Sequence, residues 1–202
     1  MTTDGRLLRG EHTRRLILNR SMDITSSEGL EGLSIGRLAT DLGISKSGLF
    51  AHFGSKEELQ LATYQAAREA FVDCVVTPAR KAPPGIRRVE TLIDSWLAYV
   101  ESRVFPGGCI IYAIAAEFDA RPGRIRDAIA AAVRDWESYL EHTIARAVDL
   151  GELAEGTDVP QLAWELHAYV WNAVGTMKLY DSVDPARRAR RAMKDRLAAV
   201  RT

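Results

Sequence analysis

Apolar residues recur along most of the chain at intervals of three and four, which is the period of an amphipathic helix. This spacing predicts helices over residues 11–28, 35–42, 46–53, 55–77, 86–104, 124–150, 162–180 and 185–200. Residues 109–118 are almost wholly apolar, so period alone allows a helix or a strand there, and the alanines and the helical surroundings favour a helix. The pattern therefore predicts an all-α protein.

The two short segments at 35–42 and 46–53 have the chemistry of a helix-turn-helix. Ala39 is small enough to let the two helices approach, and Gly43 permits the positive φ that the turn requires. An apolar seam between the helices is expected from Leu38, Leu42, Ile44 and Leu49. The second helix would then face a DNA major groove, with a first helix at 11–28 completing a three-helix domain.

The stretch that starts at Gly43 reads GISKSGLFAHFGSKEEL. It resembles the recognition segment of TetR-family one-component bacterial repressors, which usually reads close to G-V-S-K-G-A-L-Y-H-H-F-x-S-K-E-E-L. The match covers roughly the first third of the chain, and the remainder is similar in layout. The resemblance implies a helix-turn-helix DNA-binding domain at residues 1–55. It also implies a larger helical ligand-binding and dimerisation domain at 56–202.

What the resemblance implies about function is a homodimeric repressor of transcription. The partner would be double-stranded operator DNA, and a small-molecule ligand would release the protein from it. The helix predicted at 55–77 would join the two domains, so a ligand that repacks the C-terminal helices could move the recognition helices.

The expected DNA contacts lie at the starts of the two short helices and just beyond them. Lys46 is the expected base reader, and the other contacts are expected from Ser34, Ile35, Ser45, Ser47, Gly48, Phe50, His52 and Lys56. Ser34 and Ser45 are expected at phosphates, because N-cap serines leave helix N–H groups and a positive dipole end free for an anion. His52 could donate a hydrogen bond to a phosphate, and the resemblance implies a phosphate contact for Lys56. For His52, a satisfied surface histidine is an equally good interpretation.

Phe50 departs from the family pattern, which usually has Tyr at this position. The tyrosine hydroxyl often reaches a phosphate, and Phe50 has no group that can make this hydrogen bond. One positioning contact is therefore expected to be missing, and Phe50 would instead touch a thymine methyl group or a sugar.

Overall charge does not favour nucleic-acid binding. The chain has 27 Lys and Arg against 27 Asp and Glu in 202 residues. Any affinity for DNA must therefore come from a local patch. Residues 1–10, with Arg6 and Arg9, are interpreted as a frayed terminus, with an arm that touches phosphates as the alternative.

Aromatic residues on several predicted inner faces suggest a pocket for a small hydrophobic or aromatic ligand. The candidates are Tyr64, Phe71, Trp96, Tyr112, Trp136, Trp164, His167 and Trp171. Tyr112 and His167 would orient the ligand through their polar atoms. For each of these residues taken singly, an ordinary helical core is the favoured interpretation, and the pocket is suggested only by the set as a whole.

The helix at 162–180 is apolar on two sides, and such a helix is buried on two sides. One side suits the protomer's own core, and the other needs a second surface. The sequence therefore predicts a homodimer through helices 159–181 and 185–200.

Other function classes find little support. No phosphate-binding loop, nucleophile elbow or zinc-ligand spacing is present, so no cofactor, metal or catalytic group is expected. Cys74 and Cys109 suit a reduced compartment, and Cys109 is interpreted as a buried structural thiol, with a redox sensor as the alternative. The absence of a signal or membrane-spanning run predicts a cytoplasmic protein.

Two alternative functions remain open: a helical adaptor whose helix-turn-helix is only a packing motif, and an enzyme that uses the aromatic pocket.

Overall fold

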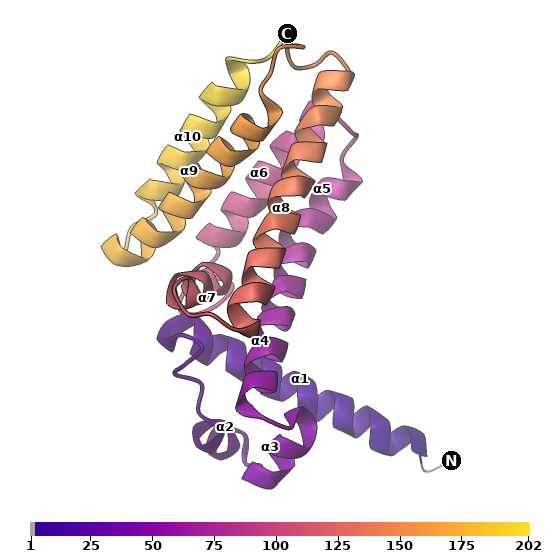
Figure 1. Cartoon of the computed structure of the whole chain (residues 1–202), viewed down its shortest axis with the longest axis vertical. Helices are drawn as coiled ribbons and strands as arrows, with labels where there is room; N and C mark the ends of the chain where they lie inside the picture. The colour runs from indigo at the N-terminus through magenta and orange to yellow at the C-terminus, as the bar shows by residue number, and fades with distance from the viewer. Residues whose placement is uncertain (1–2) are drawn as a thin grey trace. The chain divides into compact units, whose positions relative to one another are not determined.

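The computed structural model describes residues 3–202, with side chains from Leu7 onward, and these residues form an all-α protein (Figure 1). The helices are α1 (Thr3–Glu28), α2 (Ile35–Leu42), α3 (Lys46–Phe53), α4 (Lys56–Phe71), a π-helical segment η1 (Val72–Val76), α5 (Thr77–Lys81), α6 (Ile86–Glu101), α7 (Ile110–Phe118), α8 (Arg124–Asp149), α9 (Val159–Tyr180) and α10 (Asp184–Ala198). The expected all-α class is confirmed, and residues 110–118 are helical as favoured.

The helices form two compact units. Unit 1 runs up to Glu69 and also contains Phe105–Arg126, which includes α7. Unit 2 consists of Ala70–Val104 and Asp127–Thr202. The inclusion of α7 in unit 1 was not indicated by the sequence. The domain boundary expected after residue 55 stays a prediction.

Unit 1 is built on an apolar core that α1, α2, α3 and α4 share. Its buried members are Ile17, Ile24, Leu33, Leu38, Leu49, Phe53 and Leu59. Leu42 and Ile44 pack against this cluster while partly exposed, so the expected seam between the two short helices is present.

Helix α1 begins at Thr3, well before the predicted start at residue 11. The interpretation of residues 3–10 as a frayed terminus is therefore wrong. The stretch contains two glycines, Gly5 and Gly10, and each costs a helix only about 1 kcal/mol. The alternative of an arm on DNA depends partly on residues 1–2 and on the side chain of Arg6, which lie outside the described part of the structure.

The helix predicted to break at Pro78 instead continues to Lys81. Proline has no N–H and cannot bond to the carbonyl four residues earlier. The chain adjusts just before it, in η1, where the N–H of Thr77 bonds to the carbonyl of Val72, five residues back. The real stop is Ala82, whose extended ψ of 150° suits a residue that precedes Pro83.

Unit 2 is a bundle in which α9 and α10 run side by side in opposite directions (Figure 1). The small residues Ala186 and Ala189 of α10 are buried together with Met193 and Leu197. Arg196 of α10 pairs with Glu165 of α9. On the other edge of α10, Arg190 pairs with Asp94 and Glu101 of α6 at 2.6 and 3.1 Å. These ion pairs fix the position of α10 along its axis relative to α9 and α6.

Candidate functional site

The turn between α2 and α3 has the geometry of a helix-turn-helix. Gly43 has φ = +64° and ψ = 29°, which is the left-handed conformation that favours glycine. Its N–H donates to the carbonyl of Thr40 at 3.2 Å, and that of Ile44 donates to the carbonyl of Ala39 at 3.0 Å. These bonds close α2 and send the chain directly into α3.

Both short helices begin at a serine cap, as expected. Ser45 Oγ accepts from the N–H of Gly48 at 3.0 Å and shares a hydrogen bond with Ser47 Oγ at 3.1 Å. Ser34 Oγ accepts from the N–H of Arg37 at 3.5 Å. The caps leave further N–H groups at each helix start, where the helix dipole favours an anion.

The expected DNA-contacting residues share one exposed edge with few internal bonds. Lys46 and Ser47 are exposed, and Phe50 is 43% exposed, whereas Ile35, Gly48 and His52 are half-buried. The stem of Lys46 runs alongside α2, because a Cβ added to Gly36 would lie 3.5 Å from Cε of Lys46. Phe53, in the last turn of α3, is buried in the core. The helix therefore presents its first turn and Phe50 to solvent.

Lys56 lies at the start of α4 and already has protein partners. Its Nζ donates to the carbonyl of Glu31 at 3.1 Å and lies 3.6 Å from the Glu31 carboxylate. A phosphate contact by Lys56 would have to compete with this pair. Because both side chains are about half exposed, the competing ion pair contributes only about 0–1 kcal/mol.

Arg14 supports the recognition helix from α1, a role that the sequence analysis missed. Its Nη1 donates to the carbonyl of His52 at 2.7 Å, and its Cζ lies 4.3 Å from the centre of the Phe53 ring. A cation is favourable at the C-terminal end of a helix, where carbonyl groups lack partners. No local pattern could have shown this contact, since the two residues are 38 positions apart.

Glu117 of α7 holds the loop between α1 and α2. Its carboxylate accepts from the N–H groups of Leu30 at 2.6 Å and Glu31 at 2.9 Å. Nearby, the N–H of Gly107 donates to Ser26 Oγ at 2.9 Å. Glu117 therefore has a structural role in unit 1.

Five of the eight predicted ligand residues gather in unit 2 as an aromatic cluster: Phe71, Trp96, Trp136, His167 and Trp171. Trp136 packs edge-on against Phe71 and Trp96, with ring centres 5.0 and 4.8 Å apart. Tyr99 and Tyr139, which were not among the eight, also join the cluster.

The aromatic cluster contains polar atoms with unusual surroundings. His167 Nδ1 lies 3.2 Å from Glu137 Oε1, and burial lowers the pKa of His167, although Glu137 opposes that shift. Trp136 Nε1 and the hydroxyl of Tyr139 are buried and have no hydrogen-bond partner within the described chain. A buried donor without an acceptor is costly, so these atoms are suited to bond a polar ligand group.

The remaining three ligand candidates lie elsewhere. Tyr64 is buried in unit 1, and Tyr112 is half-buried on α7 of the same unit. Trp164 is 61% exposed on α9. Ligand contacts by these three stay predictions.

Among the side chains from Leu7 onward, no group of three His, Cys, Asp or Glu could hold a metal ion. Within residues 3–202, no helix is long and apolar enough to cross a bilayer.

Comparison with known proteins identifies the family. Residues 17–63 match the family model described as bacterial regulatory proteins, tetR family, and residues 85–193 match the tetracyclin repressor-like C-terminal domain. The second match alone spans more than half of the chain. The chain belongs to the TetR family. It is thus a DNA-binding transcriptional regulator, and the matches extend the resemblance seen at Gly43–Leu59 to both parts of the chain.

Individual TetR-family proteins are similar to this chain in sequence or in fold. The uncharacterized HTH-type transcriptional regulator YezE of Bacillus subtilis (strain 168) is 27% identical over 157 residues, which is 76% of this chain and 79% of YezE. A TetR transcriptional regulator from Chloroflexus aurantiacus J-10-FL shares the fold with a TM-score of 0.89 at 23% identity, over 96% of this chain and 98% of that one. AibR, in complex with isovaleryl coenzyme A and operator DNA, has a TM-score of 0.66 at 20% identity over 80% and 85% of the two chains.

Proposed function

We propose that this TetR-family regulator is a homodimeric repressor that a small hydrophobic or aromatic ligand releases from its operator. It would act in the cytoplasm and would not be an enzyme. The observation that carries the proposal is the exposed first turn of α3, which is capped by Ser45 and held on a buried core by Phe53.

Lys46 is proposed to read a base edge, because it is exposed at the start of the helix that would enter the major groove. Phosphate contacts are proposed for Ser34, Ser45, His52 and Lys56, and further contacts for Ile35, Ser47, Gly48 and Phe50. The two serine-capped helix starts support the phosphate contacts, since free N–H groups and the dipole point outward there.

Two copies of α3 must enter successive major grooves on one face of DNA, roughly 34–36 Å apart. This requirement supports the homodimer through α9 and α10. Further support comes from the large side chains that α9 leaves exposed, Trp164 at 61% and Leu179 at 76%.

The aromatic cluster is the proposed ligand site. Large rings supply apolar surface, and Trp136 Nε1 and the Tyr139 hydroxyl lack partners within the described residues. AibR was solved with both an acyl coenzyme A and operator DNA, which supports a ligand for a protein of this fold. A ligand releases the repressor only to the extent that it prefers a different packing of these helices.

The proposal is tested by footprinting the protein on the DNA upstream of its own gene, with and without a library of small aromatic metabolites. A protected segment with two half-sites, lost on adding one metabolite, is the expected result. No protection anywhere in that DNA would contradict the proposal and favour a helical adaptor.

Three lysine variants sharpen that test. Lys46→Ala should lose discrimination between the operator and unrelated DNA. Lys56→Ala should weaken binding to all DNA alike and reduce the slope of log K against log salt by about 1. Lys81→Ala on α5 is the matched control, because it removes an exposed lysine from unit 2. If Lys46→Ala weakened binding to all DNA sequences equally, Lys46 would contact a phosphate and not a base.

A further inference from the structure

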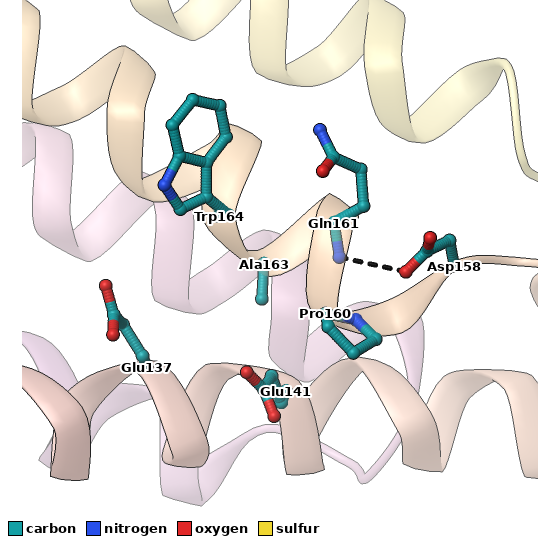
Figure 2. A pocket seen from close by; sticks show the side chains of 7 residues that line it. All are labelled: Glu137, Glu141, Asp158, Pro160, Gln161, Ala163 and Trp164. Carbon is teal, nitrogen blue, oxygen red and sulfur yellow. Dashed lines mark hydrogen bonds between the residues drawn. The ribbon is translucent and has the colours of Figure 1, made fainter.

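An acidic groove lies between α8 and the start of α9 (Figure 2). It encloses about 430 Å³ and is lined by Glu137, Glu141, Asp158, Pro160, Gln161, Ala163 and Trp164. Figure 2 shows the two glutamates on α8 and the tryptophan on α9. The groove therefore combines three carboxylates with one large exposed ring.

The carboxylates of the groove lack counter-charges. Glu141 and Asp158 form no ion pair with any other residue of the described chain, and the carboxylate of Asp158 accepts only from the N–H of Gln161, at 3.0 Å. Glu137 contacts His167, and burial of that imidazole favours its neutral form. The groove is thus an uncompensated negative site that suits a cationic surface.

Trp164 belongs to a longer uncovered face of α9. Ala168, Gly175 and Leu179 follow it at helical spacing, and Leu179 is 76% exposed. Trp164 and Leu179 lie at the two ends of this face, and the half-buried Trp171 lies between them. The small residues Ala168 and Gly175 are the positions at which another helix can approach closely. On this chain the exposed helix next to α9 is α10.

The outer edge of α10 carries the opposite charge. Arg187, Arg188, Arg191 and Lys194 are all exposed. Arg187 and Arg191 have only local pairs on their own helix, with Asp184 and Asp195. Lys194 has no ion pair with any side chain that the structure describes, and it lies one turn after Arg190, which faces α6. Lys194 is therefore on the edge of α10 that points away from α9.

Two-fold symmetry brings these two features together. In a two-fold dimer whose axis runs along the helices, and in which α9 packs on the partner's α10, these two helices lie at the same level. The groove beside α9 then lies next to the outer edge of the partner's α10. The two features also lie at the same height along the helices, because the Glu165–Arg196 pair places Trp164 beside the last turns of α10.

We infer that in the homodimer the acidic groove of each subunit receives the basic edge of the partner's α10. Glu141 pairs with the partner's Lys194, and Trp164 covers the contact. This inference rests on the proposed homodimer. The contact occurs twice per dimer, so a change of roughly fivefold per contact becomes roughly 25-fold in the dimer dissociation constant.

The test is sedimentation equilibrium of the full chain carrying charge reversals. Glu141→Lys and Lys194→Glu should each raise the dimer dissociation constant by roughly 25-fold, because each places like charges together. The double variant should restore an affinity close to that of the parent protein. Lys81→Glu on α5, which packs on α6, is the matched control and should leave the constant unchanged. Circular dichroism of each variant checks that the helices remain folded.

The outcomes separate the inference from the proposed function. If the parent protein is a dimer and both single reversals leave it unchanged, the inference is wrong and the homodimer stands. If each reversal weakens the dimer but the double variant does not recover, the groove meets a different surface and the inference is again wrong. A monomeric parent protein would refute the proposed function itself.

Discussion

Replacing Glu117 by Ala should destabilise unit 1 by releasing the loop between α1 and α2. The substitution removes the acceptor of two charge-assisted hydrogen bonds, at 2.6 Å from Leu30 N and 2.9 Å from Glu31 N. It leaves these two N–H groups without their partner. The same loop carries Glu31, which holds Lys56, so the effect should reach the proposed DNA-contacting edge.

The expected size follows from the exposure of each bond. Hydrogen bonds to charged groups contribute about 1.5–3 kcal/mol when sheltered, and less where water can replace the acceptor. The bond to Leu30 is partly buried and the bond to Glu31 is exposed. We therefore expect Glu117→Ala to lower the free energy of unfolding by about 2 kcal/mol, and Glu117→Gln, which keeps one acceptor oxygen, by about half as much.

Urea denaturation followed by circular dichroism measures this loss, and amide hydrogen exchange locates it. The N–H groups of Leu30 and Glu31 should exchange faster in the variant. Asp119→Ala is the matched control, since it removes an exposed carboxylate from the same end of α7. If Glu117→Ala and Asp119→Ala had equal midpoints and equal exchange at Leu30, the structural role of Glu117 would be refuted.

Three further predictions follow from single side chains. Phe50→Tyr should tighten operator binding about threefold to tenfold in a gel shift, because a hydroxyl on this 43%-exposed ring can reach a phosphate; an unchanged affinity would place the ring away from the backbone. Burial raises the pKa of the Cys109 thiol, so below pH 9 maleimide should label Cys74, which is exposed, well before Cys109, as mass spectrometry would show; equal rates would contradict this. The pKa of His167 is lowered in the folded state, chiefly by burial. Below about pH 6.5 the unfolded chain therefore binds more protons than the folded chain, and the free energy of unfolding decreases as the pH is lowered. His167→Asn should flatten that acid loss between pH 7 and pH 5 in urea titrations, and an unchanged slope would assign the loss to other groups.

Much of the DNA-binding part is determined by the sequence alone. The serine caps at Ser34 and Ser45, the left-handed Gly43 and the seam around Leu38 and Leu49 all depend on residues within a few positions of one another. Helix geometry sets the distances between such neighbours, so their spacing in the chain is enough to predict them. The period of apolar residues predicted the other helices for the same reason.

Contacts between distant segments were decided only by the tertiary structure. Glu117 reaches Leu30 from 87 positions away, and Arg14 reaches the end of α3 from 38 positions away. Which aromatic residues gather was also decided at this level, since the rings of Trp96 and His167 meet while Trp164 lies exposed. Such contacts depend on how loops route one helix past another, and the residue pattern of a single helix shows which side is apolar but not which helix covers it.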